Sequence, residues 1–226
     1  MAEYMVIGGA SGTGAELVRQ LIEGGNNVHA TSSRRDLPGT QWFDARSPGE
    51  LVFPERLDGL VYCPGTIRLK PFHRLTKEEF LDDFTVNCLG AVAVIQQCLP
   101  ALKRSASPSI VLFSTIAAAQ GMAFHASIAS AKGAVEGLVR SLAAEFAPAI
   151  RVNAIAPTLT DTPLAAALLD TDAKRDAARK RNPLQEVGNP TDLAAMARFL
   201  LGAESRMLSG QILRPDAGLS SIRLFQ

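Results

Sequence analysis

The sequence predicts an α/β fold: a doubly wound parallel sheet of about seven strands between two layers of helices. Short apolar segments alternate along the chain with longer amphipathic segments, which is the pattern of βαβ units. A glycine-rich segment, Ile7–Gly14, directly follows the first apolar run. The length of 226 residues, with 47% hydrophobic and 20% charged residues, is typical of one large α/β domain. We therefore expect residues 1–226 to form a single domain.

The expected elements follow from apolar periodicity and from start signals. The expected strands are Tyr4–Ile7, Val28–Thr31, Gln41–Phe43, Leu60–Tyr62, Ile110–Phe113, Arg151–Ile155 and Gln211–Leu213. The expected helices are Gly14–Glu23, Lys77–Lys103, Ser127–Phe146 and Thr191–Leu201. Thr76 and Glu79 have the spacing of a capping box, and Pro190 suits the first turn of a helix.

Charge and cysteine content exclude several classes of partner. A formal net charge of +1 provides no overall field for collecting nucleic acid, so no nucleic-acid partner is expected. Three cysteines without a C-x-x-C pair argue against a disulfide framework and against a metal site. We expect them to be small core residues of a reduced, cytoplasmic protein. No export signal is recognised and no segment is expected to reach the length of a membrane span, so no membrane partner is expected.

The most polar segment, Asp170–Arg181, has a local surplus of Lys and Arg. A solvated helix face is the favoured interpretation, because charge runs usually face water. The alternative is a binding site for an anionic carrier, such as the phosphates of a thioester.

The glycine-rich segment has the composition of a phosphate-binding loop. Glycines allow a tight turn and let the backbone approach a pyrophosphate, while the N-terminus of the following helix presents free N–H groups to the anion. An ordinary strand-to-helix turn is the alternative, but three glycines in this context favour a dinucleotide site. The residues expected to form it are Gly8, Ser11, Gly12, Thr13 and Gly14.

The end of the second strand indicates which dinucleotide is bound. An NAD-binding protein often places an acid here for the ribose 2′-hydroxyl, yet this chain has none before Asp36. Ser33, Arg34 and Arg35 instead offer hydroxyl and guanidinium donors that suit a 2′-phosphate. NADP is therefore preferred to NAD. The alternative is that both arginines belong to a solvated turn.

Further motifs follow in a fixed order. They are Asp44, Tyr62–Gly65, Asn87, Ser114–Thr115, Ala126–Lys132, Pro157–Thr162 and Ser209–Gln211. With the glycine loop, this order resembles the classical short-chain dehydrogenase/reductase (SDR) family from Met5 to about Gly218. The resemblance implies a Rossmann fold, a nicotinamide cofactor and hydride transfer. Three of the four residues in Tyr62–Gly65 depart from the family's Asn-Asn-Ala-Gly segment, and only Gly65 is retained.

The resemblance also assigns roles to individual residues. It implies that Asn87 helps to hold a water beside Lys132, and that Thr115 stands at the place of the catalytic Ser. Lys132 is expected to bind the cofactor ribose, with a surface lysine as the alternative. Asp44 is expected to contact adenine. The remaining cofactor contacts implied are Pro64, Gly65, Pro157, Thr160 and Thr162.

The reacting centre departs from the family at one decisive place. Family members carry a Tyr four residues before the Lys, and this chain has Ile128 there. A general acid contributes roughly 10²–10⁴ in rate, so another group must supply the proton or the reaction differs. His125, seven residues before Lys132, lies two helical turns away and is a capable acid near neutral pH. The alternative for His125 is a cap or loop residue.

Two functions remain open at this stage. The leading one is an NADP-dependent oxidoreductase that transfers hydride between the cofactor and a carbonyl or an activated alkene, such as an enoyl thioester, with the proton supplied by His125 or a bound water. The alternative is an SDR-like protein that binds dinucleotide without redox turnover, as a sensor, a partner subunit or a non-redox catalyst. Wide apolar faces on the two long central helices suggest subunit packing, and the resemblance implies a homotetramer or homodimer built on those helices.

Overall fold

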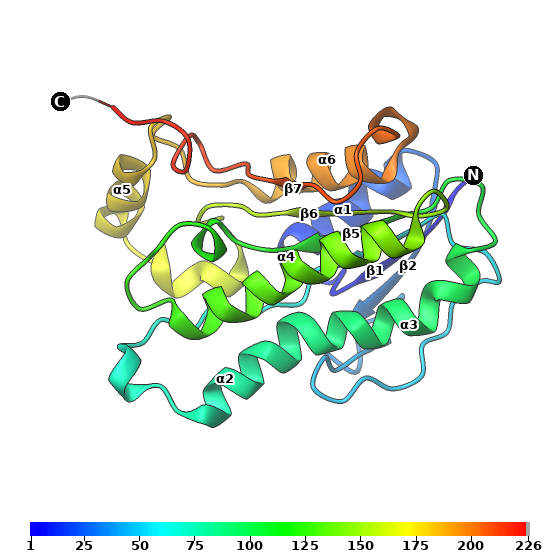
Figure 1. Cartoon of the computed structure of the whole chain (residues 1–226), viewed down its shortest axis with the longest axis horizontal. Coiled ribbons are helices and arrows are strands. Elements are labelled where there is room, and N and C mark those ends of the chain that lie inside the picture. The colour runs from blue at the N-terminus through cyan, green and yellow to red at the C-terminus, as the bar shows by residue number, and fades with distance from the viewer. Residues whose placement is uncertain (225–226) are drawn as a thin grey trace.

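The computed structural model describes residues 1–224, and a seven-stranded parallel sheet forms its centre (Figure 1). The strands are β1 (Glu3–Ile7), β2 (Asn27–Ser32), β3 (Thr40–Trp42), β4 (Gly59–Tyr62), β5 (Ser109–Phe113), β6 (Arg151–Ile155) and β7 (Ile212–Leu213). They lie in the order β3-β2-β1-β4-β5-β6-β7. All seven strands expected from the sequence are confirmed, with ends shifted by one residue at most.

The central strands are buried on both faces because their side chains alternate between two hydrophobic clusters. Leu60 and Tyr62 of β4 belong to one cluster, and Val61 between them belongs to the other. β5 repeats this alternation with Ile110 and Val111. Successive side chains of a strand point to opposite faces, so a continuous apolar run requires cover on both sides of the sheet.

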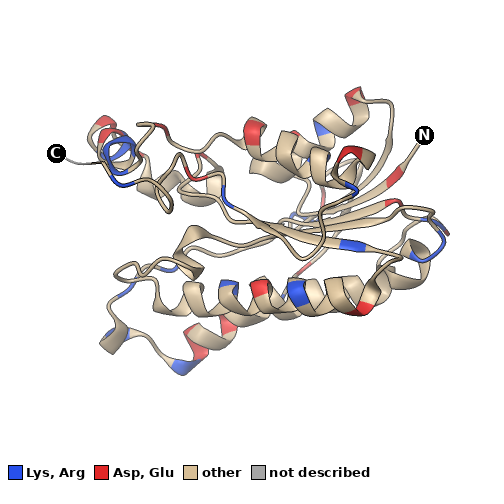
Figure 2. Cartoon of the chain, turned by 45° about the horizontal axis from the view of Figure 1, so that its top comes forward, with Lys and Arg blue, Asp and Glu red and all other residues tan. Residues whose placement is uncertain are grey.

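Helices supply that cover in two layers. They are α1 (Gly12–Glu23), α2 (Lys77–Phe84), α3 (Gly90–Leu102), α4 (Ala126–Phe146), α5 (Asp172–Arg181) and α6 (Pro190–Leu201). α3 and α4 pack on one face of the sheet, while α1 and α6 lie side by side on the other. Figure 2 shows both layers with the sheet between them, and Lys and Arg interspersed with Asp and Glu over the helices. The predicted three-layer Rossmann fold is therefore confirmed.

The long helix expected at Lys77–Lys103 is interrupted. A π-helical turn, Thr85–Leu89, joins α2 to α3 and contains Asn87. Such turns insert one extra residue and often occur at functional sites. The capping box expected at its start is confirmed, because Thr76 Oγ1 accepts from the Glu79 N–H and the Glu79 carboxylate accepts from the Thr76 N–H.

This helix also corrects the expectation that no segment has the length of a membrane span. Lys77–Leu102 has 26 residues and a mean hydropathy of 1.4 in its most apolar window, which is sufficient by length and composition alone. Its apolar composition has a structural cause within the described chain. Val94, Ile95 and Cys98 of α3 pack in the core cluster on that face of the sheet.

The loops that could carry a site leave the sheet at one edge. Parallel strands all point the same way, so the segments that follow β1, β4, β5 and β6 emerge together. The loop after β5 contains the short 3₁₀ segment η3 (Ile116–Ala118), and the loop after β6 contains η4 (Pro163–Leu168).

The packing of β4 predicts a measurable loss of stability. Leu60 is fully buried on β4, so Leu60→Ala should lower the free energy of unfolding by about 2–5 kcal/mol, since it removes buried methyl groups and leaves a cavity. Urea unfolding followed by circular dichroism measures the change. Val52→Ala is the control, because Val52 is 76% exposed and its truncation should change the free energy by less than about 0.5 kcal/mol. Equal effects of the two substitutions would contradict the packing described.

Candidate active site

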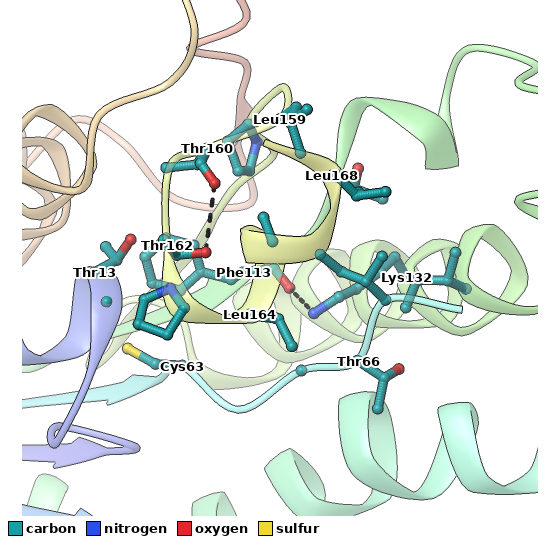
Figure 3. A pocket seen from close by; sticks show the side chains of 18 of the residues that line it. Thr13, Cys63, Thr66, Phe113, Lys132, Leu159, Thr160, Thr162, Leu164 and Leu168 are labelled. Atoms are coloured by element: carbon teal, nitrogen blue, oxygen red, sulfur yellow. Dashed lines mark hydrogen bonds between the residues drawn. The ribbon is translucent and has the colours of Figure 1, made fainter. Parts of the chain in front are cut away.

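A cavity of about 870 Å³ opens at the carboxyl ends of the strands. Its walls come from the glycine loop after β1, the loops after β4, β5 and β6, and the helices α4 and α5. It lies where β1 and β4 pair, which is the place where the strand order changes direction. Open α/β sheets bind their ligands at such a point. Figure 3 shows part of this wall.

The glycine loop has the geometry that close approach to an anion requires. Gly8 and Gly12 have φ of +76° and +52°, in the left-handed region that favours glycine. A Cβ at Gly14 would collide with the carbonyl oxygen of Gly8, so only glycine fits there. Ser11 is the N-cap of α1, and within the described chain its side chain makes no cap hydrogen bond. The first N–H groups of α1 are therefore available to a ligand beside the cavity.

The three residues expected at the cofactor's 2′-phosphate, Ser33, Arg34 and Arg35, lie in different places. Ser33 lines the cavity, and so does Asp44, which is expected to contact adenine. Arg34 and Arg35 do not belong to its wall. The Arg34 guanidinium reaches back to the Ala10 carbonyl oxygen at 3.4 Å, beside the glycine loop, whereas the Arg35 guanidinium stacks over the Trp42 ring at 4.0 Å. The structure thus holds Arg34 next to the glycine loop and turns Arg35 toward the Trp42 ring.

Lys132 is buried at the wall of the cavity. Its side chain is 7% exposed, and its Nζ donates to the Phe113 carbonyl oxygen at 2.7 Å (Figure 3). An ammonium has three donor hydrogens, so this bond holds Nζ in place and leaves donors for ligands in the cavity. Burial lowers the pKa of Lys132 to about 8, and the thiols of Cys63 and Cys88 oppose that shift. The interpretation of Lys132 as a surface lysine is therefore wrong.

Asn87 is held beside Lys132 by the π-helical turn. Its Nδ2 donates to the Asp83 carbonyl oxygen at 2.7 Å and to Thr66 Oγ1 at 2.9 Å. Its buried Oδ1 has no hydrogen-bond partner among residues 1–224. A Cβ at Gly65 would lie 3.2 Å from this Oδ1 and 3.5 Å from Lys132 Nζ. Glycine thus keeps open the space between an unpaired acceptor and an ammonium, where a donor such as water fits.

Thr115 lies at the end of β5, where its hydroxyl begins the segment η3. Thr115 Oγ1 accepts from the Ala117 N–H at 3.4 Å, which leaves its own hydrogen free to donate into the cavity. The neighbouring Ser114 also lines the cavity, but its hydroxyl donates to Glu136 Oε1 at 2.9 Å. Of the two hydroxyls at this strand end, that of Thr115 is therefore the better placed to bind a ligand oxygen.

His125 and Ile128 belong to the same wall as Lys132. Ile128 is buried and carries no polar side-chain atom. His125 is the N-cap residue of α4, and its Nδ1 lies 2.7 Å from the Ala123 carbonyl oxygen. Because a carbonyl oxygen only accepts, this bond places the proton on Nδ1. The His125 side chain then donates from Nε2 only when the imidazole is protonated.

The structure brings together most of the residues that the sequence singled out. The cavity wall contains Gly8, Ser11, Gly12, Thr13, Gly14, Ser33, Asp44, Pro64, Gly65, Thr115, His125, Lys132, Pro157, Thr160 and Thr162. Asn87 lies directly behind this wall.

Other lining residues were not identified from the sequence. Cys63 and Thr66 flank the Pro64–Gly65 segment, and their proximity to Gly65 was the only signal available. Burial raises the pKa of the Cys63 thiol to about 12, so it is not a ready nucleophile. Many other lining side chains are apolar, among them Ile67, Leu69, Ile116, Met122, Leu159, Leu164 and Leu168.

Most of the polar segment Asp170–Arg181 forms α5, which faces both solvent and the cavity. Most of its charged side chains are exposed, as the interpretation of a solvated face predicts. Ala178 is nonetheless buried, and Lys174 and Arg181 line the cavity mouth. Lys174 Nζ is already bonded to the Asp170 carboxylate and the Ala167 carbonyl oxygen, each at 2.8 Å.

The lowered pKa of Lys132 predicts a pH-dependent contribution to stability. Between pH 8 and 10.5 the unfolded chain holds this amine protonated while the folded chain does not, so stability rises with pH across that window. The free energy of unfolding of the wild type, relative to Lys132→Met, should increase by on the order of 3 kcal/mol from below pH 8 to above pH 10. Urea unfolding of both proteins at several pH values tests this. A difference that stays constant over the window would rule out the lowered pKa.

Comparison with known proteins identifies the relatives of this chain. The family model described as "Enoyl-(Acyl carrier protein) reductase" matches residues 50–220. A tropinone reductase homologue of Arabidopsis thaliana is 36% identical over 170 residues, which are 75% of this chain and 65% of that protein. The match thus spans slightly less than two thirds of that relative's length. The L-xylulose reductase of Bos taurus is 29% identical over 95% of this chain and 94% of its own length.

Solved structures agree with these matches. A short-chain type dehydrogenase/reductase from Mycobacterium ulcerans has a TM-score of 0.86 and 25% identity, and the match covers 96% of this chain and 89% of that one. An Agrobacterium tumefaciens protein solved with bound NADP has a TM-score of 0.89 and 25% identity, with 98% and 97% covered. The matched family model, the similarity over most of the chain and the shared fold lead to one conclusion: this protein belongs to the short-chain dehydrogenase/reductase family.

Proposed function

We propose that this protein is an NADP-dependent oxidoreductase that transfers hydride between the cofactor and a carbonyl or an activated alkene, such as an enoyl thioester. The observation that carries the proposal is that one cavity joins the open N-terminus of α1 to the buried Lys132. The bound nicotinamide supplies or accepts the hydride. All other steps depend on residues of the chain.

The residues present fit a dinucleotide. The glycine loop lacks the side chains that would obstruct a pyrophosphate, and Gly14 tolerates none. Ser33 in the cavity and Arg34 beside the loop offer donors suited to a 2′-phosphate, which supports NADP over NAD. Lys132 and the unpaired Asn87 Oδ1 would hold ribose and water. Pro64, Gly65, Pro157, Thr160 and Thr162 line the part of the cavity proposed for the nicotinamide.

The roles proposed for the protein's polar side chains follow from their hydrogen bonds. Thr115 would donate to the substrate oxygen, because its acceptor position is already used by the Ala117 N–H. Ile128 cannot donate a proton, so the proton that the substrate oxygen receives must come from another group. His125 at the cavity wall is one source, provided that its imidazole is protonated, and a bound water is another. The many apolar side chains that line the cavity favour a substrate whose reacting group is attached to an apolar body.

A second copy of the chain is proposed to cover the outer face of α2 and of the π-helical turn that follows it. Leu81, Phe84 and Leu89 lie on this stretch and are exposed by 53%, 37% and 46%. Apolar side chains clustered in this way are typical of subunit interfaces, which supports a homodimer or homotetramer.

The proposed activity predicts consumption of NADPH that depends on Lys132. Purified protein should oxidise NADPH with at least one member of a panel of ketones, β-ketoacyl thioesters and enoyl thioesters. Lys132→Met should lower kcat/KM by about 100-fold or more, since it removes a buried donor at the reacting centre. Lys103→Ala, an exposed lysine at the end of α3, serves as the control. Tight NADPH binding without turnover on any substrate would favour the alternative, a dinucleotide-binding protein without redox turnover.

The choice of cofactor predicts a selective effect of Arg34. Arg34→Ala should raise the KM for NADPH about tenfold or more, because it removes a charged donor to the 2′-phosphate, and leave the KM for NADH nearly unchanged. Arg56→Ala is the matched control, since Arg56 is exposed and pairs with Asp58. Initial rates with each cofactor measure both constants. An equal rise for the two cofactors would contradict a role at the 2′-phosphate.

A further inference from the structure

A buried carboxyl group lies behind the cavity wall and is reached from the cavity through a single hydroxyl. We propose that Thr66, backed by Asp83, exchanges the proton with the substrate oxygen in place of the missing phenol. Thr66 is then the catalytic residue that meets the substrate, and Asp83 is a positioning residue that acts through it. The inference rests on the proposed function and names a proton path within it.

Asp83 of α2 is fully buried, and its carboxylate is held from three sides. Oδ1 accepts from Thr66 Oγ1 at 2.7 Å, in the loop after β4, and from Arg68 Nε at 3.4 Å. Oδ2 accepts from Ser127 Oγ at 2.5 Å, in the first turn of α4. Donation by two hydroxyls and a guanidinium is the pattern of an ionised carboxylate, which accepts only.

Charged groups around Asp83 form a network on its outer side. Arg68 also pairs with Glu79 at 3.2 Å and with Asp82 at 2.7 Å. Arg46 pairs with Asp82 at 2.6 Å. Since Arg68 is shared among three carboxylates, it compensates Asp83 only in part, and the long 3.4 Å contact to Oδ1 agrees with this. The Thr66 hydroxyl at 2.7 Å is therefore a closer partner of Oδ1 than the Arg68 guanidinium.

Thr66 connects this carboxylate to the cavity. Its hydroxyl donates to Asp83 and accepts from Asn87 Nδ2 at 2.9 Å, so one lone pair is left for a donor. Thr66 lines the cavity, and Figure 3 shows it on the same side as Lys132. The preceding residue, Gly65, lies close to both Asn87 Oδ1 and Lys132 Nζ, so Thr66 directly follows the residue that borders the space between them. The available lone pair can therefore accept from a substrate hydroxyl.

Ser127 does not offer the same path. Its hydroxyl also donates to Asp83, but its side chain is 1% exposed and does not line the cavity. Ser127 therefore holds Asp83 in place, whereas Thr66 alone of the two hydroxyls meets a ligand.

The proton transfer balances in both directions. In alcohol oxidation the substrate O–H bond breaks, its proton bonds to Thr66 Oγ1, and the original Thr66 proton passes to Asp83 Oδ1. The carbon gives up its hydride to NADP⁺, so the alcohol is oxidised and the cofactor is reduced. After the product leaves, the proton returns to solvent through Thr66. In carbonyl reduction a proton first passes from solvent through Thr66 to Asp83. NADPH then gives its hydride to the carbon, the substrate oxygen takes the Thr66 proton, and Asp83 Oδ1 returns its proton to Thr66 Oγ1.

Thr66 and Asp83 substitutions test this path in the full-length protein. Single-turnover hydride transfer is measured with NADP⁺ and the alcohol that corresponds to the best carbonyl substrate of the panel. Thr66→Val, which removes the hydroxyl but keeps the shape, should slow the step about 100-fold or more, and Thr66→Ser should stay within about fivefold of the wild type. Asp83→Asn should slow hydride transfer, with little change in the KM for the alcohol. Asp176→Asn is the control, because Asp176 is an exposed carboxylate of α5 that pairs with Arg179 and does not line the cavity.

Solvent isotope effects separate proton transfer from a merely structural role. In mixtures of H₂O and D₂O, two protons moving together should give a curved dependence of rate on deuterium fraction in the wild type. Asp83→Asn should give a linear one. Circular dichroism and NADPH binding verify folding, and if Asp83→Asn does not fold, the Thr66 pair decides the question, because Thr66 lies in a loop.

Three outcomes overturn the inference. Rates of hydride transfer in Thr66→Val and Asp83→Asn within threefold of the wild-type rate would disprove the proton path but not the proposed oxidoreductase activity. Loss of hydride transfer in His125→Gln, with a wild-type rate in Thr66→Val, would instead assign the proton transfer to the His125 imidazole. A wild type that binds NADPH but turns over no substrate would overturn both the path and the proposed function.

Discussion

The pairing of β1 with β4 is the constraint on which the rest of this molecule depends. Ile7 and Tyr62, at the ends of these strands, stand in register, so the loops that follow them begin side by side. A Cβ at Gly8 would lie 3.2 Å from Pro64 Cδ, which shows how closely the two loops approach. Burial of both strands makes a shift of register costly, because it would turn apolar side chains to the wrong face. The strand register therefore also fixes the positions of the loops that line the cavity.

Two buried ionisable groups lie near this junction without bonding to each other. Lys132 is fixed by the Phe113 carbonyl oxygen, and Asp83 by two hydroxyls and Arg68. Neutral groups of Asn87 and Thr66 stand between them. An ion pair at this place would neutralise both and remove the donors and acceptors from the cavity. Separation by an amide and a hydroxyl instead keeps each available for chemistry, although burial opposes the charge of both groups and only Asp83 has a counter-ion, Arg68.

The same network determines how the helices meet. Ser127 in the first turn of α4 donates to Asp83 of α2, so the helix that carries Lys132 is anchored to the helix that leads into the π-helical turn. Because Asn87 lies in that turn, one set of buried hydrogen bonds orients Lys132, Asn87 and Thr66 together. A substitution in the network therefore affects both packing and chemistry, which is why matched variants such as Thr66→Ser are informative.

Much of this protein could be predicted from the sequence because it depends on local patterns. Alternating apolar runs specify the strands, glycines at 8, 12 and 14 specify the phosphate loop, and the order of motifs specifies the family. Only the tertiary structure decided that Arg35 faces Trp42, that Lys132 is buried with a lowered pKa, and that Thr66 joins Asp83 to the cavity. These features arise from contacts between residues far apart in the chain. Local periodicity carries no information on how such side chains meet, because desolvation and hydrogen-bond geometry are set only when the elements pack.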